Sequence, residues 1–211
     1  MARHPIRKAA KKKPSRTYHH GNLREALIEA TLQLVQEGGP EAVTVREAAR
    51  RAGVSSGAPF RHFPNRTVLM TAVAEEATHR LHAAVLAAVE PIVDRPPLVQ
   101  LRAIGRAYLQ WASDNPTHFA IVSNRGLIDY ESSSSMKRDN EEIQAMMGRL
   151  LDAAGAPAEA KLAARAFVYG LARMRIDDHL PQWGVTSPAE ALSAMNAALD
   201  LFLEGLLRPR V

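Results

Sequence analysis

The chain of 211 residues contains no cysteine. This absence excludes disulfides, thiol catalysis and zinc sites with cysteine ligands, and it fits a reducing cytoplasm. No apolar run approaches the roughly 20 residues of a membrane span, and no apolar signal-peptide core follows the basic N-terminus, so we expect neither insertion nor export. Aromatic residues are scarce at 5%, yet hydrophobic residues reach 46%, enough for one or two buried cores.

Patterns that carry catalysis are also missing. The sequence has no glycine-rich phosphate loop, no nucleophile elbow and no zinc-protease motif. Asp177 and Asp178 are adjacent, so on a helix their carboxylates point in different directions and make a poor acid–base pair. We therefore expect a protein that is not an enzyme and that needs no cofactor.

Histidines offer one weak metal pattern. His79 and His82 are three residues apart and share one face of an expected helix, and His118 or His179 could supply a third nitrogen. A surface pair of histidines without a metal is the more common case. We therefore predict no metal site.

The most informative stretch is TVREAARRAGVSSGAPFRHF, residues 44–63. Thr44 and Glu47 have the spacing of a capping box, which predicts a helix from about Val45. Gly53 supplies the left-handed residue that ends this helix. Its apolar residues recur on one face, which leaves the charged residues to water or to a partner.

A second short helix is expected from Ser55, its cap, to about Phe63. Phe60 and Phe63 are predicted to pack inward, while polar residues remain outside. Two short helices joined by a glycine-containing turn are typical of the helix-turn-helix motif, whose second helix enters a DNA major groove.

The same stretch resembles the N-terminal domain of the TetR family of bacterial transcriptional regulators, whose pattern runs roughly T-x-x-x-[IV]-A-x-x-A-G-V-S-x-G-x-[LI]-Y-x-[HY]-F-x-[ND]-K-x-x-L. The residues that carry the resemblance are Thr44, Ala48, Ala49, Ala52, Gly53, Val54, Ser55, Gly57, Phe60, His62, Phe63, Asn65 and Leu69.

Three residues depart from that pattern. Phe60 replaces the usual Tyr and lacks the hydroxyl that the family aims at a phosphate, whereas Arg66 replaces Lys and keeps the charge. Pro59 stands where an aliphatic residue is usual, in the first helical turn, where a missing N–H is best tolerated.

The resemblance implies DNA contacts from ten residues: Thr44, Arg46, Ser55, Ser56, Gly57, Ala58, Phe60, Arg61, His62 and Arg66. We assign Thr44, Ser55 and Arg66 to phosphates. Ser56, Ala58 and Arg61 are expected to read bases, and the Arg61 guanidinium suits guanine. Within the second helix of the motif, the sequence does not distinguish the residues that contact bases from those that contact phosphates.

Charge is distributed unevenly along the chain. Residues 1–66 hold 13 Lys and Arg against five Glu, a balance of +8, although the whole chain carries only +5. A positive face neutralises phosphates and releases counterions, although a merely solvated basic surface is the alternative. Residues 1–16, with seven basic residues and no acidic one, predict either a DNA-following arm or a disordered tail with diffuse attraction.

The remaining chain is predicted to be helical, with no sustained strand alternation. Caps are expected at Asn22, Asn65 and Asn115, together with a Ser187–Glu190 capping box. The further helices are expected over residues 23–37, 65–89, 96–113, 116–123, 136–154, 157–178 and 188–207, with a loop over 126–135. The prediction is thus an all-α fold of about nine helices.

Three parts are expected along the chain. Residues 1–20 form a basic arm, residues 21–66 a three-helix DNA-binding domain with the helix-turn-helix, and residues 67–211 a helical effector-binding and dimerisation domain. The helix over 65–89 would connect the two domains as a transmission rod.

The last two helices, over 157–178 and 188–207, are rich in small residues that allow close helix approach. The small residues are Ala160, Ala163, Ala164, Gly170, Ala172, Ala191, Ala194, Ala197 and Ala198. With Leu199, Leu201, Phe202, Leu203 and Leu206 they would form a four-helix bundle between two subunits, which the resemblance implies. The alternative is that they fill a core within one subunit.

The resemblance also implies a small-molecule pocket in the middle helices. Its candidate lining residues are Tyr108, Trp111, Phe119, Met146, Met147, Phe167 and Met174, although such a stripe is more often core. A polar cluster near the end of the helix over 157–178 is expected either to pair internally or to meet a polar ligand. Its members are Arg173, Arg175, Asp177, Asp178 and His179.

The sequence thus predicts a cytoplasmic, homodimeric, ligand-responsive regulator that represses transcription from a palindromic operator. The sign of regulation depends on promoter position, which leaves activation open. The main alternative is a chromosome-coating protein without sequence preference.

Overall fold

The computed structural model describes residues 22–207, which form eight α-helices and four 3-10 helices and contain no strand. The α-helices are α1 (Asn22–Gly38), α2 (Val45–Arg51), α3 (Arg66–Val89), α4 (Pro97–Asp114), α5 (Pro116–Val122), α6 (Ser134–Ala153), α7 (Ala160–Ile176) and α8 (Pro188–Leu206). The 3-10 helices are η1 (Pro40–Ala42), η2 (Ala58–Arg61), η3 (Glu90–Ile92) and η4 (Leu180–Trp183). The predicted all-α fold is confirmed, whereas the basic arm and the side chain of Asn22, the predicted cap, lie outside what is described.

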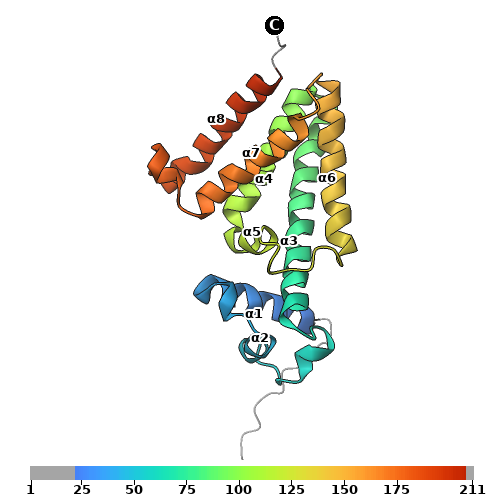
Figure 1. Ribbon diagram of the computed structural model, residues 1–211, viewed down its shortest axis with the longest axis vertical. Helices are drawn as coiled ribbons and strands as arrows, with labels where there is room; N and C mark the ends of the chain where they lie inside the picture. Colours follow the sequence, from blue (N-terminus) through green and yellow to red (C-terminus); the bar gives the residue numbers. More distant parts are fainter. Residues whose placement is uncertain (1–21, 208–211) are drawn as a thin grey trace, which may run out of the picture.

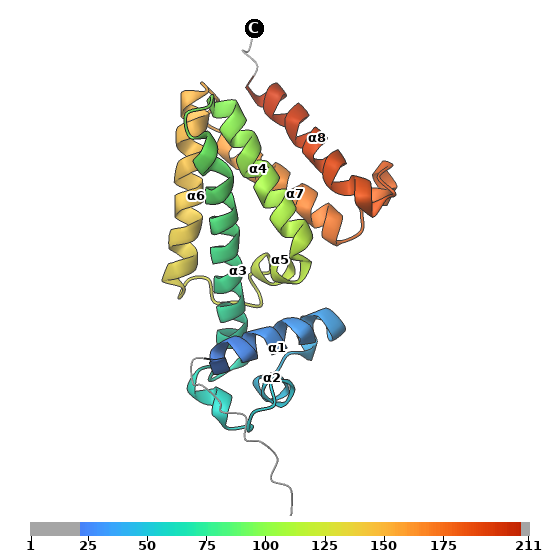
Figure 2. The ribbon, with the colours of Figure 1, turned by 180° about the vertical axis from the view of Figure 1, so that it is seen from behind.

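The molecule is elongated, with α1 and α2 at one end and α4, α6, α7 and α8 gathered toward the other (Figures 1 and 2). The long helix α3 joins the two ends. Its cap is Asn65, as predicted, whose side-chain oxygen accepts a hydrogen bond from the N–H of Val68 at 2.9 Å. Within residues 22–207, no helix is long and apolar enough to cross a membrane.

Helix α3 passes through both hydrophobic cores. Its first turns, with Leu69 and Met70, pack with Leu27 of α1 and Phe63 in the N-terminal core. Ile121 of α5 belongs to the same core. Further along α3, Val85 belongs to the second core, to which α4, α7 and α8 also contribute buried residues. The N-terminal helices are therefore attached to the rest of the protein by shared packing, and the boundary at residue 66 stays a prediction.

The largest difference from the sequence prediction lies in the second helix of the motif. A helix from Ser55 to about Phe63 was expected, but only the four residues of η2 are helical, and they form a 3-10 helix. Pro59 has no N–H, so it cannot bond the carbonyl of Ser55, and the N–H of Ala58 reaches that carbonyl instead at 3.1 Å. The other eight of the nine predicted helices are α-helices, and this one is not.

Three predicted helix starts are capped differently. The predicted Ser187–Glu190 capping box is wrong, because the Ser187 side chain makes no capping hydrogen bond to α8. The N–H of Glu190 bonds the backbone carbonyl of Ser187 instead, at 3.1 Å. Asn115 does not cap α5, because its amide donates back to the Trp111 carbonyl at 2.9 Å. Helix α6 begins inside the expected loop, since Ser133 caps it by accepting from the N–H of Met136.

Candidate nucleic-acid interface

Helix α2 begins as the sequence predicts. The Thr44 hydroxyl accepts a hydrogen bond from the N–H of Glu47 at 3.0 Å. The Glu47 carboxylate, which was expected to return to the backbone of Thr44, accepts from both Nε and Nη2 of Arg50. The capping box is therefore half formed. The Thr44 hydroxyl keeps its own proton available for an acceptor such as a phosphate oxygen.

The turn after α2 depends on Gly53, which adopts the predicted left-handed conformation with φ of 70°. The N–H of Val54 bonds the Ala49 carbonyl at 3.0 Å and closes this helix end. Pro59 is buried where the family places an aliphatic side chain, and Phe63 is buried as predicted. The prediction for Phe60 is wrong: its ring is 41% exposed, because Pro59 occupies the inward position beside it.

The predicted DNA-binding residues gather at the free end of the molecule, below α1 in Figure 1. Most of their side chains face solvent. Thr44, Arg46, Ser55, Ser56, Gly57, Phe60, Arg61 and His62 are exposed, whereas Ala58 and Arg66 are half-buried. The exposed group combines two cations, several hydroxyls and an aromatic ring on one surface, which is a composition suited to phosphates and base edges.

Two of the four arginines between residues 46 and 61 are neutralised within the protein. Arg50 pairs with Glu47, and Arg51 forms a two-bond pair with Glu37 of α1, at 2.5 and 2.6 Å. These hydrogen bonds lower the pKa of both carboxyl groups below their usual range. Within residues 22–207, no hydrogen bond or ion pair engages the side chain of Arg46 or Arg61, so these two cations remain for a partner.

Arg66 lies differently from the other predicted phosphate contacts. Its Nε donates to the Val43 carbonyl at 3.1 Å and its Nη2 to the Pro40 carbonyl at 2.9 Å. Glu41 lies 3.7 Å from Nη2. Much of the guanidinium is thus used to hold the α1–α2 connection against the start of α3, and a phosphate contact from Arg66 stays a prediction.

Several side chains that connect the two ends of the protein were missed in the sequence. Glu75 of α3 accepts from the hydroxyl of Ser133 at 2.8 Å and lies 3.6 Å from Arg24 of α1. Thr71 accepts from the N–H of Asp129 at 2.9 Å. The partners of Glu75 and Thr71 in the loop before α6 are 58 residues distant along the chain, so no local sequence pattern could reveal them.

A cavity of about 440 Å³ lies between α3, α4, α6, α7 and α8. Its wall is mainly apolar, with a few polar side chains from α6 and α7. It is lined by Leu81, Val85, Leu101, Ile104, Gly105, Tyr108, Ile143, Met147, Ala158, Leu162, Ala164, Val168, Leu199 and Leu203 together with Asn140, Gln144, Lys161 and Arg165. The size and the mixed lining are typical of small-molecule sites.

Only part of the predicted pocket lining reaches this cavity. Tyr108 and Met147 line it, and the Arg165 guanidinium carbon lies 4.9 Å from the centre of the Tyr108 ring. Burial raises the pKa of Tyr108, and the nearby Arg165 opposes that rise. Trp111, Phe119, Met146, Phe167 and Met174 lie in or against the surrounding core and do not line the cavity.

The small residues of α7 and α8 divide between two faces. Ala160, Ala164, Ala172 and Ala191 are buried in the core of the protomer itself. On α8, several small or apolar residues at helical spacing remain partly or fully exposed: Ala194, Ala197, Ala198, Leu201 and Gly205. The Leu201 side chain is 73% exposed. Helix α8 therefore has one face packed inward and one apolar face without a partner in the protomer.

The polar cluster at the end of α7 pairs internally in part. Arg173 donates two hydrogen bonds to the Asp177 carboxylate, at 2.8 and 2.7 Å. The expected internal pairing is thus confirmed for these two residues.

Comparison with known proteins gives consistent matches. Residues 27–73 match a family model described as bacterial regulatory proteins of the tetR family, and residues 101–199 match one described as a tetracyclin repressor-like C-terminal domain. The transcriptional regulator BetI of Cronobacter sakazakii is 28% identical over 128 residues, which are 61% of each chain. The alignment therefore spans less than two thirds of that relative.

Solved structures share the fold over nearly the whole chain. A Rhodococcus sp. RHA1 protein with unknown function superimposes with a TM-score of 0.71 at 28% identity, covering 92% of this chain and 100% of its own. A tetR-family regulatory protein from Rhodococcus RHA1 superimposes with a TM-score of 0.70 at 20% identity. The superposition covers 87% of this chain and 96% of the other.

Proposed function

The chain belongs to the TetR family of bacterial transcriptional regulators, and on this premise we propose that it is a repressor that binds a palindromic operator as a homodimer and is released by a small-molecule effector. Members of the family are DNA-binding transcription factors, not enzymes. The finer features of the proposal concern the operator, the dimer and the effector.

The observation that carries the proposal is the pair of unpaired cations on the exposed surface of the motif. Arg46 and Arg61 are free, whereas the neighbouring Arg50 and Arg51 are held by glutamates. Arg61 lies in η2, the position of the reading helix in this motif. We assign base reading to Ser56, Ala58 and Arg61, and phosphate contacts to Thr44, Ser55 and Arg66, to which the free Arg46 is added.

Selection of genomic fragments by the full-length protein tests this function. Fragments that share a palindrome with half-sites about 34–36 Å apart, or a multiple of one helical turn, support it. Recovery of fragments with no common sequence would instead favour a chromosome-coating protein. Lys11, Lys12 and Lys13 belong to the basic segment outside the described residues, and replacing all three with Ala should weaken every duplex alike and flatten the salt dependence.

The unpartnered face of α8 supports dimerisation. Leu201 is 73% exposed, and Phe167 of α7 stacks on Phe202 of α8 with ring centres 4.3 Å apart, so the two helices present one joint surface. A two-fold pair would bury this surface and fix the distance between two reading elements.

The cavity supports an effector with an apolar body and an acidic group. Most of its wall is aliphatic, while Lys161 and Arg165 place two cations along α7. Decanoate and decylammonium are matched probes, because they share the alkyl chain and differ in head-group charge. Decanoate should lower operator affinity more than decylammonium, and Arg165→Gln should remove most of the difference; equal effects of both probes would contradict this assignment.

In this proposal the DNA-binding domain ends at residue 66, the effector-binding and dimerisation domain follows it, and the protein acts in the cytoplasm. An effector can shift operator affinity only by its differential affinity for the DNA-competent and released states. Helix α3, which shares both cores, is the natural element to carry that difference.

A further inference from the structure

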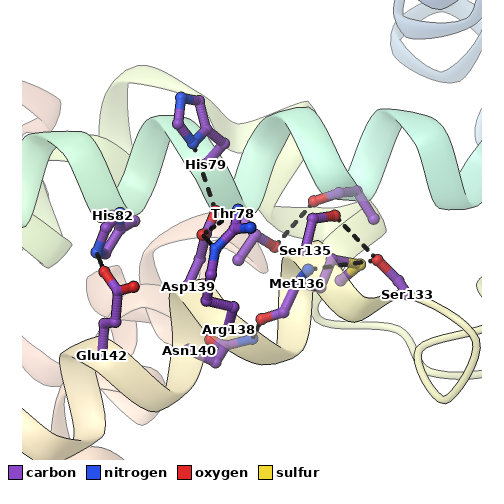
Figure 3. Close-up of polar contacts among 11 residues, drawn as sticks. Thr78, His79, His82, Ser133, Ser135, Met136, Arg138, Asp139, Asn140 and Glu142 are labelled. Atoms are coloured by element: carbon purple, nitrogen blue, oxygen red, sulfur yellow. Dashed lines mark hydrogen bonds and ion pairs between the residues drawn. The ribbon is translucent and has the colours of Figure 1, made fainter.

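Two histidines of α3 and a carboxylate of α6 lie together on the side of the molecule where these helices run side by side (Figure 3). One ligand atom from each of His79, His82 and Asp139 falls within 4.8 Å of the other two. The sequence pattern suggested His118 or His179 as a third ligand, but the third group is Asp139. His82 is also buried, so the expectation of a pair of surface histidines is wrong for it.

The distances suit a metal ion with short bonds. Nδ1 of His79 lies 3.4 Å from Oδ2 of Asp139, and Nε2 of His82 lies 2.8 Å from Oε2 of Glu142. In a tetrahedral site with bonds of about 2.0–2.2 Å, neighbouring ligand atoms are roughly 3.3–3.5 Å apart. The His79–Asp139 pair already has this separation, and the three ligand atoms, which lie within 4.8 Å of one another, need only a small closure around an ion.

A second observation concerns the buried nitrogen of His82. The His82 side chain is only 10% exposed, and its Nε2 makes no hydrogen bond, although Glu142 is close enough for an ion pair. A buried polar atom without a partner is costly, and a cation between the imidazole and the carboxylate would satisfy both.

Asp139 is prepared for the same role. Its side chain is 4% exposed, and its Oδ1 accepts from Nε and Nη2 of Arg138 at 3.3 and 3.2 Å. The other oxygen, Oδ2, faces His79. Arg138 thus fixes the orientation of the carboxylate, as outer partners do for metal-binding carboxylates.

We propose that His79, His82 and Asp139 bind a divalent transition-metal ion of the zinc class, with Glu142 beside them at 2.8 Å from Nε2 of His82. Imidazole nitrogens combined with carboxylate oxygens favour Zn²⁺, Ni²⁺, Co²⁺ or Cu²⁺, whereas Ca²⁺ and Mg²⁺ prefer oxygen ligands alone. The ion holds α6 against α3, one helical turn beyond Glu75, whose contacts reach both Ser133 and Arg24. Metal binding itself does not depend on the function proposed above.

The test is a titration of the full-length protein with Zn²⁺ by calorimetry and with Co²⁺ by its visible absorption. One ion per protomer should bind, and Co²⁺ should give the intense bands of a tetrahedral site. His79→Gln, at a side chain that is 70% exposed, should fold normally and lower the affinity about tenfold or more. Asp139→Asn should do the same while leaving both histidines in place.

Controls separate this site from other histidines. Two control variants should bind the metal ion as tightly as the wild type. One is His179→Gln, at an exposed position, and the other is the double variant His19→Gln/His20→Gln, outside the described residues. Zn²⁺ should also raise the melting temperature of the wild type but not that of His79→Gln. Unchanged affinity in both His79→Gln and Asp139→Asn, or binding lost only in the His19/His20 variant, would overturn the proposal.

Discussion

The hydroxyl of Ser133 donates a hydrogen bond of 2.8 Å to Oε1 of Glu75 and so joins the first turn of α6 to α3. The same hydroxyl oxygen accepts from the N–H of Met136 and caps α6. Because Oε2 of Glu75 lies 3.6 Å from Arg24, one carboxylate connects α6, α3 and α1. A change in the position of α6 can therefore be transmitted to α1, the helix that supports the DNA-binding motif.

Ser133→Ala should lower the free energy of unfolding by about 1–2 kcal/mol, because it removes both the helix cap and the bond to Glu75. Glu75→Gln keeps an acceptor oxygen and should cost less. Urea unfolding measures both. Ser134→Ala, at the exposed neighbouring position, is the matched control and should stay within about 0.5 kcal/mol of the wild type; an equal loss in this control would show that the Ser133 contacts are unimportant.

Arg61→Ala should relax the preference at one operator position and cost about 1–3 kcal/mol for the preferred sequence, because Arg61 is exposed and unpaired. Binding to a set of single-substitution operators measures this preference. Arg50→Ala removes a cation that is already paired with Glu47 and should have a smaller, uniform effect. If Arg61→Ala weakens every sequence equally, the assignment of base reading is wrong.

Phe60→Tyr should strengthen binding to all duplexes by about 0.5–1.5 kcal/mol, because it adds the hydroxyl that the family directs to a phosphate. The ring is 41% exposed, so the hydroxyl can reach a partner without burial. Affinities for operator and unrelated DNA measure the effect, with Phe60→Leu as the control for ring packing. A gain confined to one sequence would contradict a phosphate contact.

Leu201→Asp should convert the proposed dimer into monomers and abolish tight operator binding, because it places a charge on the apolar face of α8. Sedimentation at several concentrations and operator titration measure the two effects. Val93→Asp is the matched control, since Val93 is 63% exposed but lies between α3 and α4. A Leu201→Asp protein that remains dimeric would remove this face from the proposed interface.

His118 of α5 should make the protein less stable in mild acid. Burial lowers the pKa of His118 below its ordinary value of 6.5, and the charge of Arg80 lowers it further, against weaker opposing effects of Glu76 and Glu29. Its Nε2 is buried without a hydrogen bond. The unfolded chain therefore binds the proton more readily, so stability is full above pH 6.5 and falls as the pH drops toward the lowered folded value.

Unfolding midpoints in urea at about pH 7.5 and 5.5 check this expectation. His118→Gln should reduce the difference between the two midpoints, whereas His179→Gln, at an exposed position, should leave it unchanged. A difference as large in His118→Gln as in the wild type would assign the acid sensitivity to other groups.

The sequence by itself determined the helices and the motif, because these depend on neighbours in the chain. Thr44 and Asn65 cap their helices, and Gly53 ends α2 at a left-handed residue, as local chemistry requires. The largest exception is η2, where Pro59 removes one donor and shortens the expected helix to a 3-10 turn. Pro59 is visible in the sequence, but it was expected to be tolerated in the first turn of an α-helix, and no α-helix forms there.

Only the tertiary structure decided which distant side chains meet. Ser133 and Glu75, Arg51 and Glu37, and His79 and Asp139 are pairs from different helices, and their contacts depend on how those helices rotate and pack. The cavity likewise received Tyr108 and Met147 but not Trp111 or Phe119, since apolar side chains at helical spacing fill a core or line a hollow with the same sequence pattern. Local hydrogen bonding encodes an element in consecutive residues, whereas contacts between elements exist only once the packing of the whole chain fixes them.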